Sequence, residues 1–298
     1  MNKVQIEEAF KKLQIDIISS LEAADGIGKF RFDEWQREEG GGGLSSIVEN
    51  GKIIEKGGVN FSAVEGPLNP QAAKSLGVEP GVFFATGVSI VLHPNNPMVP
   101  IIHMNIRYFE MDGGEYWFGG GIDLTPHYIQ EDQARTFHQA LKNTCDKHNP
   151  DYYPEFKVWA DDYFFIKHRN ETRGIGGIFF DRLNQETRGL SKEELFNFVL
   201  DVGKTFAPVY TKFMSELHHL PFNETQRNWQ LLRRGRYVEF NLVYDRGTRF
   251  GLETGGRTES ILMSLPNQAN WTYDFQTEAG SPEEKTLSLL KKGLQWAK

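Results

Sequence analysis

The sequence has little cysteine, no long apolar run and no excess of positive charge. Among 298 residues there is one cysteine, Cys145, so an intrachain disulfide is excluded, as is a zinc or iron–sulfur site built on several cysteines. This favours a reducing compartment, and we expect a cytoplasmic protein. No apolar run is long enough to span a membrane, and the acidic Glu7, Glu8 and Asp16 argue against a signal peptide. We therefore expect no integral membrane association.

The net charge of −7 makes the whole-molecule field repel polyanions, so we expect no nucleic-acid partner. A small anionic ligand is not excluded by this charge. Such a ligand would need a local concentration of arginine, because guanidinium groups bind carboxylates with two parallel hydrogen bonds.

Helical patterns occupy five stretches of the chain. An amphipathic helix opens the sequence and ends near Gly26, and two further helices are expected over 129–148 and 151–165. Ser191 and Glu194 form a capping box that predicts a helix to about Leu217. A last helix is expected from Ser281, where an N-cap precedes proline and two acids.

Strand patterns fill most of the remainder. Asn50-Gly51 predicts a type I′ hairpin within 37–66, and three β segments between 81 and 124 predict an antiparallel meander that places His93 and His103 close together. A strand is expected in 173–183, a hairpin over 237–256 with Asp245 and Arg246 at its turn, and a strand in 260–266. We therefore predict one α+β domain, 1–298, on a largely antiparallel sheet.

Familiar catalytic motifs are absent. There is no HExxH, no GxSxG, and no phosphate-binding loop at 40–43, while GIGGIFF (174–180) lacks the sixth-position glycine of a dinucleotide site. The segment VSIVLHPNNPMVPIIHMNIRYF (88–109) contains two histidines and an arginine. The histidines are consistent with a metal site, and the arginine is consistent with a site for an anionic ligand. Arginine and aspartate recur at strand ends and turns: Arg107, Asp123, Arg173, Asp245, Arg246 and Arg257. Each is equally consistent with a turn residue or a surface ion pair. Several of them converging on one cleft would bind a ligand with several carboxylates.

Five long segments carry a resemblance to a known family. They are GGGGLSSIVENGKIIEKGGVNFSAVEG, HPNNPMVPIIHMNIRYFEM, YWFGGGIDLTP, VWADDYFFIKHRNETRGIGGIFFD and GRYVEFNLVYDRGTRFGLETGGRTESILMSLP. In this order they resemble the oxygen-dependent coproporphyrinogen III oxidases over almost the whole chain.

The resemblance implies an enzyme of haem biosynthesis that oxidatively decarboxylates two propionates of coproporphyrinogen III to vinyl groups, giving protoporphyrinogen IX. It implies molecular oxygen as the oxidant with no further required cofactor, and carbon dioxide and hydrogen peroxide as products. It also implies a homodimer and a large flat antiparallel sheet covered by helices on both faces.

Site residues follow from the resemblance position by position. His103 matches the proposed proton donor, and Asp123, Asp245 and Arg246 match acid and arginine positions implicated in substrate binding or catalysis. The region linked to dimer contacts matches 237–271. Substrate contacts match Ser89, Asn105, Ile106, Arg107, Gly255, Gly256 and Arg257. Four histidines match divalent-metal ligands of some bacterial members, although other members are described as needing no metal: His93, His103, His138 and His168.

The resemblance suggests a mechanism in which the electron-rich substrate itself activates oxygen. Asp123 or Asp245 would accept pyrrole N–H bonds, Arg107 would hold the departing propionate ionised, and His103 would move a proton. Two alternatives stay open. One is a metal-dependent oxygenase that uses the four histidines, and the other is a non-catalytic tetrapyrrole carrier.

Overall fold

Antiparallel strands form the main sheet of the computed structural model, which describes residues 1–253 and 256–298. In the described residues this sheet has seven strands in the order β1-β2-β3-β4-β5-β6-β9, with β7 (Phe165–Ile166) and β8 (Glu171–Thr172) forming a separate pair. The predicted meander and α+β class are confirmed. The main strands are β1 (Arg31–Gln36), β2 (Gly41–Glu49), β3 (Ile54–Pro67), β4 (Val82–Pro94), β5 (Ile101–Met111), β6 (Tyr116–Thr125) and β9 (Gly177–Leu183).

The predicted β2–β3 hairpin is present, but its turn is not type I′. That turn type needs positive φ at both central residues, and of the pair only Asn50 has it, at 57°. Residues 50–53 instead form a longer turn around the buried carboxylate of Asp25, which accepts hydrogen bonds from the backbone N–H groups of Lys52, Ile53 and Ile54. The contact with α1 (Lys3–Asp25) thus decides the shape of this turn.

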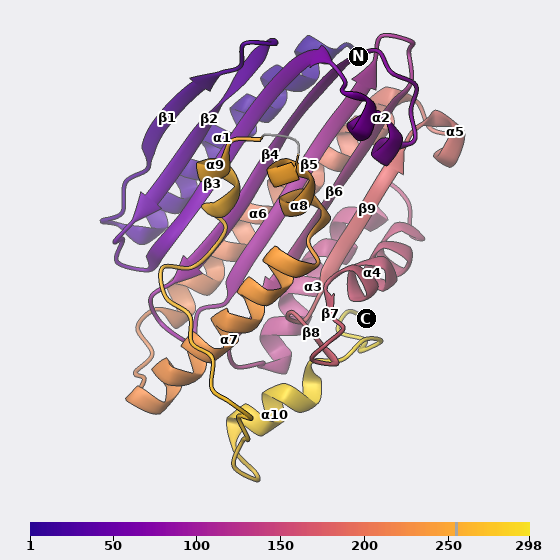
Figure 1. Ribbon diagram of the computed structural model, residues 1–298. Coiled ribbons are helices and arrows are strands. Elements are labelled where there is room, and N and C mark those ends of the chain that lie inside the picture. The colour runs from indigo at the N-terminus through magenta and orange to yellow at the C-terminus, as the bar shows by residue number, and fades with distance from the viewer. Residues whose placement is uncertain (254–255) are drawn as a thin grey trace.

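Two long helices cover one face of the sheet. α1 and α6 (Lys192–Leu217) pack together there, beside α3 (Glu131–Asp146) (Figure 1). The capping box of Ser191 and Glu194 starts α6, as predicted. A Cβ added at Gly203 of α6 would come within 2.5 Å of Leu13, so glycine lets the two helices approach closely.

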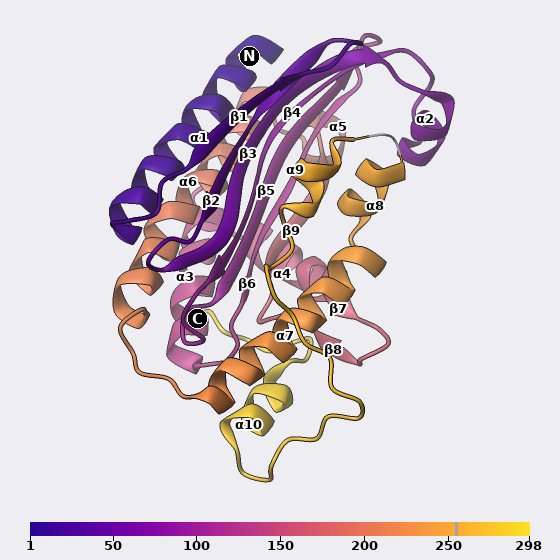
Figure 2. The ribbon, with the colours of Figure 1, turned by 60° about the vertical axis from the view of Figure 1, so that its left-hand side comes forward.

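The other face carries α7 (Glu224–Val243), α8 (Arg246–Glu253) and α9 (Thr258–Leu262), which lie in front of the strands in Figure 1 and apart from α1 and α6 in Figure 2. Helices therefore cover both faces, as expected. The remaining helices lie at the edges: α2 (Pro70–Leu76), α4 (Tyr152–Tyr163), α5 (Gln185–Arg188) and α10 (Pro282–Leu289). In the described ranges no helix combines the length and apolar character needed to cross a membrane.

The hairpin predicted over 237–256 and the strand predicted in 260–266 are wrong, because this region forms α7, α8 and α9. Aromatic and branched residues in YVEFNLVY favour a strand locally, but the buried Trp229, Arg233, Tyr237 and Phe240 recur at helical spacing, and Tyr237 packs on Val91 and Ile101 of the sheet. Asn223 starts this helix with a capping box, so tertiary packing and the cap outweigh local strand propensity.

Candidate active site

Polar side chains lie in register across the sheet on the face that α7, α8 and α9 cover. Directly paired residues of antiparallel strands point to the same face, so a row of paired residues is a row of neighbouring side chains. At about 4.8 Å per strand this row crosses roughly 29 Å. From β1 to β9 its members are Asp33, Ser45, Asn60, Ser89, Asn105, Gly121 and Phe179.

Glycines occupy several positions in the two rows of paired residues that flank this polar row. One of these rows contains Gly43, Ser62, Gly87, Arg107 and Gly119, and the other contains Gly58, Val91, His103, Asp123 and Gly177. Where a strand has no side chain, a flat ligand can come against the backbone. We call this glycine-bearing surface of the three rows the polar face.

Arg107 is oriented by two neighbours on the polar face. Its guanidinium donates to Asn105 Oδ1 at 2.8 Å and lies 3.0 Å from Asp181 Oδ1, while 36% of the side chain stays exposed. Ser89 is the direct cross-strand partner of Asn105. The structure thus brings together three predicted substrate contacts around a cation that an anionic group can reach.

Ile106 differs from the other predicted substrate contacts on β5. Side chains alternate along this strand, so the Ile106 side chain points to the opposite face, where it is fully buried next to Gly203 of α6. Its side chain belongs to the apolar core, and its predicted contact with the substrate stays a prediction that only its backbone could fulfil.

Asp123 lies at the centre of a buried charged group. Its Oδ1 accepts hydrogen bonds from His103 Nδ1 at 2.8 Å and from Arg173 Nη2 at 2.7 Å, and Arg173 Nε donates to Oδ2 at 3.2 Å. Burial alone would raise the pKa of Asp123, but the Arg173 cation and the His103 hydrogen bond outweigh it and hold that pKa below its ordinary value. The carboxylate is therefore ionised at neutral pH.

This arrangement corrects the expectation that Asp123 accepts pyrrole N–H bonds directly. The side chain is 1% exposed and both oxygens are occupied. His103 lies between it and the open side, with 20% of its side chain exposed, and its Nε2 makes no hydrogen bond within the described part of the chain. With Nδ1 donating to Asp123, Nε2 is the atom available for proton transfer.

Asp245 and Arg246 stand at the start of α8. Asp245 Oδ2 accepts from the backbone N–H and hydroxyl of Thr248, each at 2.7 Å, so it caps the helix. Its Oδ1 accepts from the hydroxyl of Tyr163 at 2.9 Å, and the Tyr163 ring stacks at 4.0 Å on Phe179 of the polar row. The exposed Arg246 has its guanidinium 6.0 Å from the Tyr163 ring. The pair therefore lies beside the β9 end of the polar face.

Arg257 lies at the opposite end, just before α9. Its guanidinium donates to Asp33 and, at 3.3 Å, to Ser45 Oγ. Asn60 donates to the backbone carbonyl of Ser260 on the same helix, at 3.3 Å. The sequence analysis did not identify Asp33, Ser45 and Asn60. The alternation of side chains along β1, for Asp33, and along β2, for Ser45, was the signal that could have indicated the first two. Gly256 is exposed beside Arg257, and Gly255 lies outside the described residues.

The four predicted metal ligands do not come together. In the ranges 1–253 and 256–298, no group of three or more His, Cys, Asp or Glu side chains is placed to hold a metal ion. His138 of α3 has both ring nitrogens occupied, by the Tyr153 hydroxyl and the Ile175 carbonyl, each at 2.9 Å. Burial lowers the pKa of His138 to about 3, as expected of a neutral structural imidazole.

His93 and His168, the remaining two predicted metal ligands, have surroundings that differ from each other. His93 Nε2 donates to the Ser264 carbonyl at 2.8 Å, and burial, followed by the nearby Arg234 cation, lowers its pKa well below the ordinary value. The same cation opposes a divalent ion there. His168 is exposed and bonds Glu239 at 2.7 Å and the Tyr244 hydroxyl at 2.8 Å. The residues present do not fit the predicted four-histidine site.

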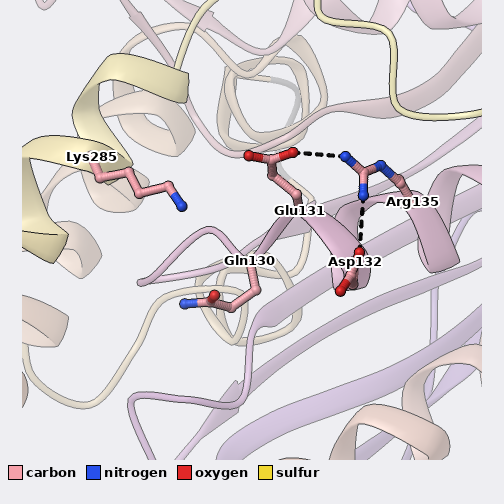
Figure 3. A pocket seen from close by; sticks show the side chains of 5 residues that line it. All are labelled: Gln130, Glu131, Asp132, Arg135 and Lys285. Carbon is pink, nitrogen blue, oxygen red and sulfur yellow. Dashed lines mark hydrogen bonds and ion pairs between the residues drawn. The ribbon is translucent and has the colours of Figure 1, made fainter.

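A surface hollow at the start of α3 is unrelated to the polar face. Figure 3 shows Arg135 paired with Glu131 and Asp132, at 2.7 and 2.9 Å, with Gln130 and Lys285 completing the lining. All three paired side chains are largely exposed, so water screens these ion pairs. None of the predicted site residues lines this hollow.

The polar face and its surrounding arginines define an α+β protein suited to a flat ligand with several carboxylates. The family model described as "Coproporphyrinogen III oxidase" matches residues 5–296. The "Oxygen-dependent coproporphyrinogen-III oxidase, chloroplastic" of Glycine max is 48% identical over 309 residues, covering 99% of this chain and 79% of the relative. The "Oxygen-dependent coproporphyrinogen-III oxidase" of Drosophila melanogaster is 48% identical over 306 residues, covering 98% and 77%. The chain belongs to the coproporphyrinogen III oxidase family.

Proposed function

We propose that this protein oxidatively decarboxylates two propionates of coproporphyrinogen III to vinyl groups, giving protoporphyrinogen IX in haem biosynthesis. For each propionate, the carbon next to the ring loses the equivalent of a hydride and the carboxylate leaves as carbon dioxide. Dioxygen takes the hydride and one proton to become hydrogen peroxide. The observation that carries the proposal is the polar face with Arg107, in a chain that matches this family from end to end.

The polar face matches the chemistry of this substrate. A porphyrinogen is a broad ring with four propionates at its rim. It therefore needs a binding surface, or floor, that has no bulky side chains beneath the ring and has cations around the rim. Gly87 supplies such a floor, while the space that a side chain would fill at Gly119 holds the Arg107 guanidinium and that at Gly121 holds the Phe179 ring. Arg107, Arg246 and Arg257 are the cations at the centre and the two ends.

Arg107 and His103 take the two chemical roles. Arg107 holds a propionate ionised and in position, because only the carboxylate loses carbon dioxide. His103, with its Nδ1 fixed by Asp123, exchanges a proton at Nε2 with the substrate or with the peroxide. Asp123 acts through His103 in this scheme, because its carboxylate is buried behind the imidazole and is paired with Arg173.

Molecular oxygen is the only co-reactant in this proposal. The surroundings of His93, His138 and His168 favour structural roles for them over metal ligation. A metal-dependent oxygenase would require these side chains to leave their present partners.

The direct test is turnover of coproporphyrinogen III by chelator-treated protein, under air and under nitrogen, with product tetrapyrrole and dissolved oxygen followed together. We expect product under air alone, with two oxygen molecules consumed per protoporphyrinogen. Activity that is lost with the chelator and returns with a divalent ion would establish the metal-dependent alternative. Tight binding without oxygen uptake would establish the carrier.

We also propose a homodimer through the region 237–271. Five large apolar side chains among the described residues of this region are exposed in the single chain, among them Leu242 at 45%, Val243 at 49% and Trp271 at 54%. Light scattering should give a dimer mass for the protein and a monomer mass for Leu242→Arg. Val158→Arg, which changes an even more exposed apolar residue on α4, should stay dimeric. A monomeric unsubstituted protein would contradict the proposal.

A cytoplasmic location remains part of the proposal and rests on the single, buried Cys145. The relative from Glycine max is described as chloroplastic, so at least one member of the family has another location. Fractionation of the source cells tests it, and recovery with an organelle would contradict it.

A further inference from the structure

Arg173 is a cation enclosed by aromatic rings. It lies between β8 and β9, and 2% of its side chain is exposed. Its guanidinium carbon lies 4.4 Å from the ring centre of Phe164 and 4.7 Å from those of Tyr237 and Phe240. Burying a charge without a partner is very costly, so this position demands a close and permanent anion.

The hydrogen bonds of Arg173 fix the plane of its guanidinium. Nε and Nη2 donate to the two oxygens of Asp123 at 3.2 and 2.7 Å, and Nη1 donates to Asn241 Oδ1 of α7 at 2.8 Å. Because donors on both sides of the fork are in use, neither the arginine nor the Asp123 carboxylate can rotate without breaking a buried bond.

This constraint extends to His103. Asp123 Oδ1 also accepts from His103 Nδ1 at 2.8 Å, and the Phe164 ring that lies against Arg173 packs edge-on at 6.0 Å to the imidazole. The hydrogen bond places the ring proton on Nδ1 and leaves Nε2 as the atom that faces the open side.

We propose that Arg173 is a positioning residue for the decarboxylation: through Asp123 it fixes the orientation and tautomer of His103. The inference rests on the proposed function. Arg173 is too deeply buried to contact the substrate, so its effect must pass through the other two side chains.

Removing the cation has a specific chemical consequence. A carboxylate left alone in this buried position would take up a proton, because nothing would offset its desolvation. A protonated Asp123 would donate to His103 Nδ1, and the imidazole proton would then sit on Nε2. The imidazole would present a donor to the substrate side where it now presents an acceptor.

The experiment compares Arg173→Met and Arg173→Lys with Arg233→Lys as a matched control. Arg233 is equally buried, at 3% exposure, and pairs with Glu171 at 2.8 Å, away from Asp123. Turnover is measured across neutral pH, and nitrogen NMR of the histidine side chains reports the tautomer of His103 without any substrate.

We expect Arg173→Met to lower kcat by about 10² to 10⁴, the range of a lost acid–base group, with a much smaller change in KM. The His103 signal should change to the Nε2–H tautomer. Arg173→Lys keeps the positive charge but loses the two parallel hydrogen bonds, so its kcat should lie between those of the unsubstituted protein and Arg173→Met. Arg233→Lys should reduce stability and leave the pH profile and the His103 tautomer unchanged.

An Arg173→Met protein that keeps its kcat and pH profile, while the unsubstituted protein turns over the substrate, would overturn this inference alone. A folded, unsubstituted protein without turnover would overturn the proposed function instead, and the NMR comparison would still test the positioning. Should Arg173→Met not fold, Asn241→Ala removes the Nη1 bond and keeps the ion pair. It should lower kcat by about two- to tenfold, and an unchanged kcat and His103 signal there would overturn the inference.

Discussion

The two faces of the main sheet use the same strands for different purposes. Along β5, Met104, Ile106 and Tyr108 are fully buried against the layer that contains α1 and α6. The residues that alternate with them, His103, Asn105 and Arg107, are half-buried on the polar face. Because side chains alternate along a strand, one sequence provides both an apolar core and a functional surface.

The difference between the faces also appears in what holds their side chains. On the apolar face, burial of each large side chain contributes about 1.5–3 kcal/mol, and packing alone fixes its position. On the polar face, position depends on directional pairs such as Arg107 with Asn105 and Asp123 with His103. Substitutions on the first face should therefore reduce stability, and substitutions on the second should reduce turnover.

The largest effect is expected for Asp123→Asn. The amide keeps the shape of the side chain but removes the charge next to His103 and leaves the buried Arg173 without its anion. We expect kcat/KM to fall by about 10² to 10⁴. Steady-state turnover of coproporphyrinogen III checks this, and an unchanged rate in a folded protein would remove Asp123 from the mechanism.

Arg107→Ala should lose binding and rate together. A hydrogen bond to a charged group contributes about 1.5–3 kcal/mol, so kcat/KM should fall roughly 10- to 100-fold. Arg135→Ala is the control, because Arg135 also pairs with two carboxylates but in the exposed hollow of Figure 3. Equal losses in the two variants would show that Arg107 has no special role.

A smaller effect is expected at the glycine floor. A Cβ added at Gly119 would come within 2.8 Å of Arg107 Nε and 2.6 Å of Asp181 Oδ1, so Gly119→Ala must displace the arginine. We expect KM to rise by about three- to tenfold with kcat less affected. Gly113→Ala, in the β5–β6 turn where an added Cβ meets nothing within 4 Å, should match the unsubstituted protein. If the two alanine variants behave alike, the placement of Arg107 over Gly119 does not matter for substrate binding.

The smallest effect concerns stability at low pH. Burial opposes the ionisation of Glu239, but hydrogen bonds from Arg169 and His168 outweigh it and lower its pKa to about 2. Because this pKa is lower in the folded protein, ionised Glu239 stabilises the fold at pH values above about 4.3, the pKa of glutamate in an unfolded chain. That stabilisation is lost as the pH falls towards 2. Glu239→Gln should therefore lower Tm at neutral pH, and the difference should shrink with acidification. A Tm difference that is constant from pH 7 to pH 3 would contradict this account.

Local sequence signals predicted the elements that depend on local interactions. The Ser191–Glu194 capping box gave the start of α6, and short turns gave the meander of β4, β5 and β6. Strand alternation places the side chains of His103 and Arg107 on one face and that of Ile106 on the other, a local signal that the sequence analysis did not use.

Long-range contacts account for what the sequence did not reveal. The pair of Arg173 and Asp123 joins residues 50 positions apart, and Arg257 with Asp33 joins residues 224 positions apart. The helix α7 was mistaken for a strand because packing against the sheet outweighs the strand propensity of YVEFNLVY. The capping residues Asn223 and Gln226 were the local signal that could have corrected it.

The most direct test of the division between the faces compares two neighbours on β5. Turnover of coproporphyrinogen III and Tm are measured for Asn105→Ala and Ile106→Ala. Asn105→Ala should lower kcat/KM by about tenfold or more and change Tm little, because it frees the Arg107 guanidinium. Ile106→Ala should reduce stability by about 2–5 kcal/mol and leave kcat/KM of the folded protein nearly unchanged. The reverse pattern, with turnover lost in Ile106→Ala and kept in Asn105→Ala, would contradict the account.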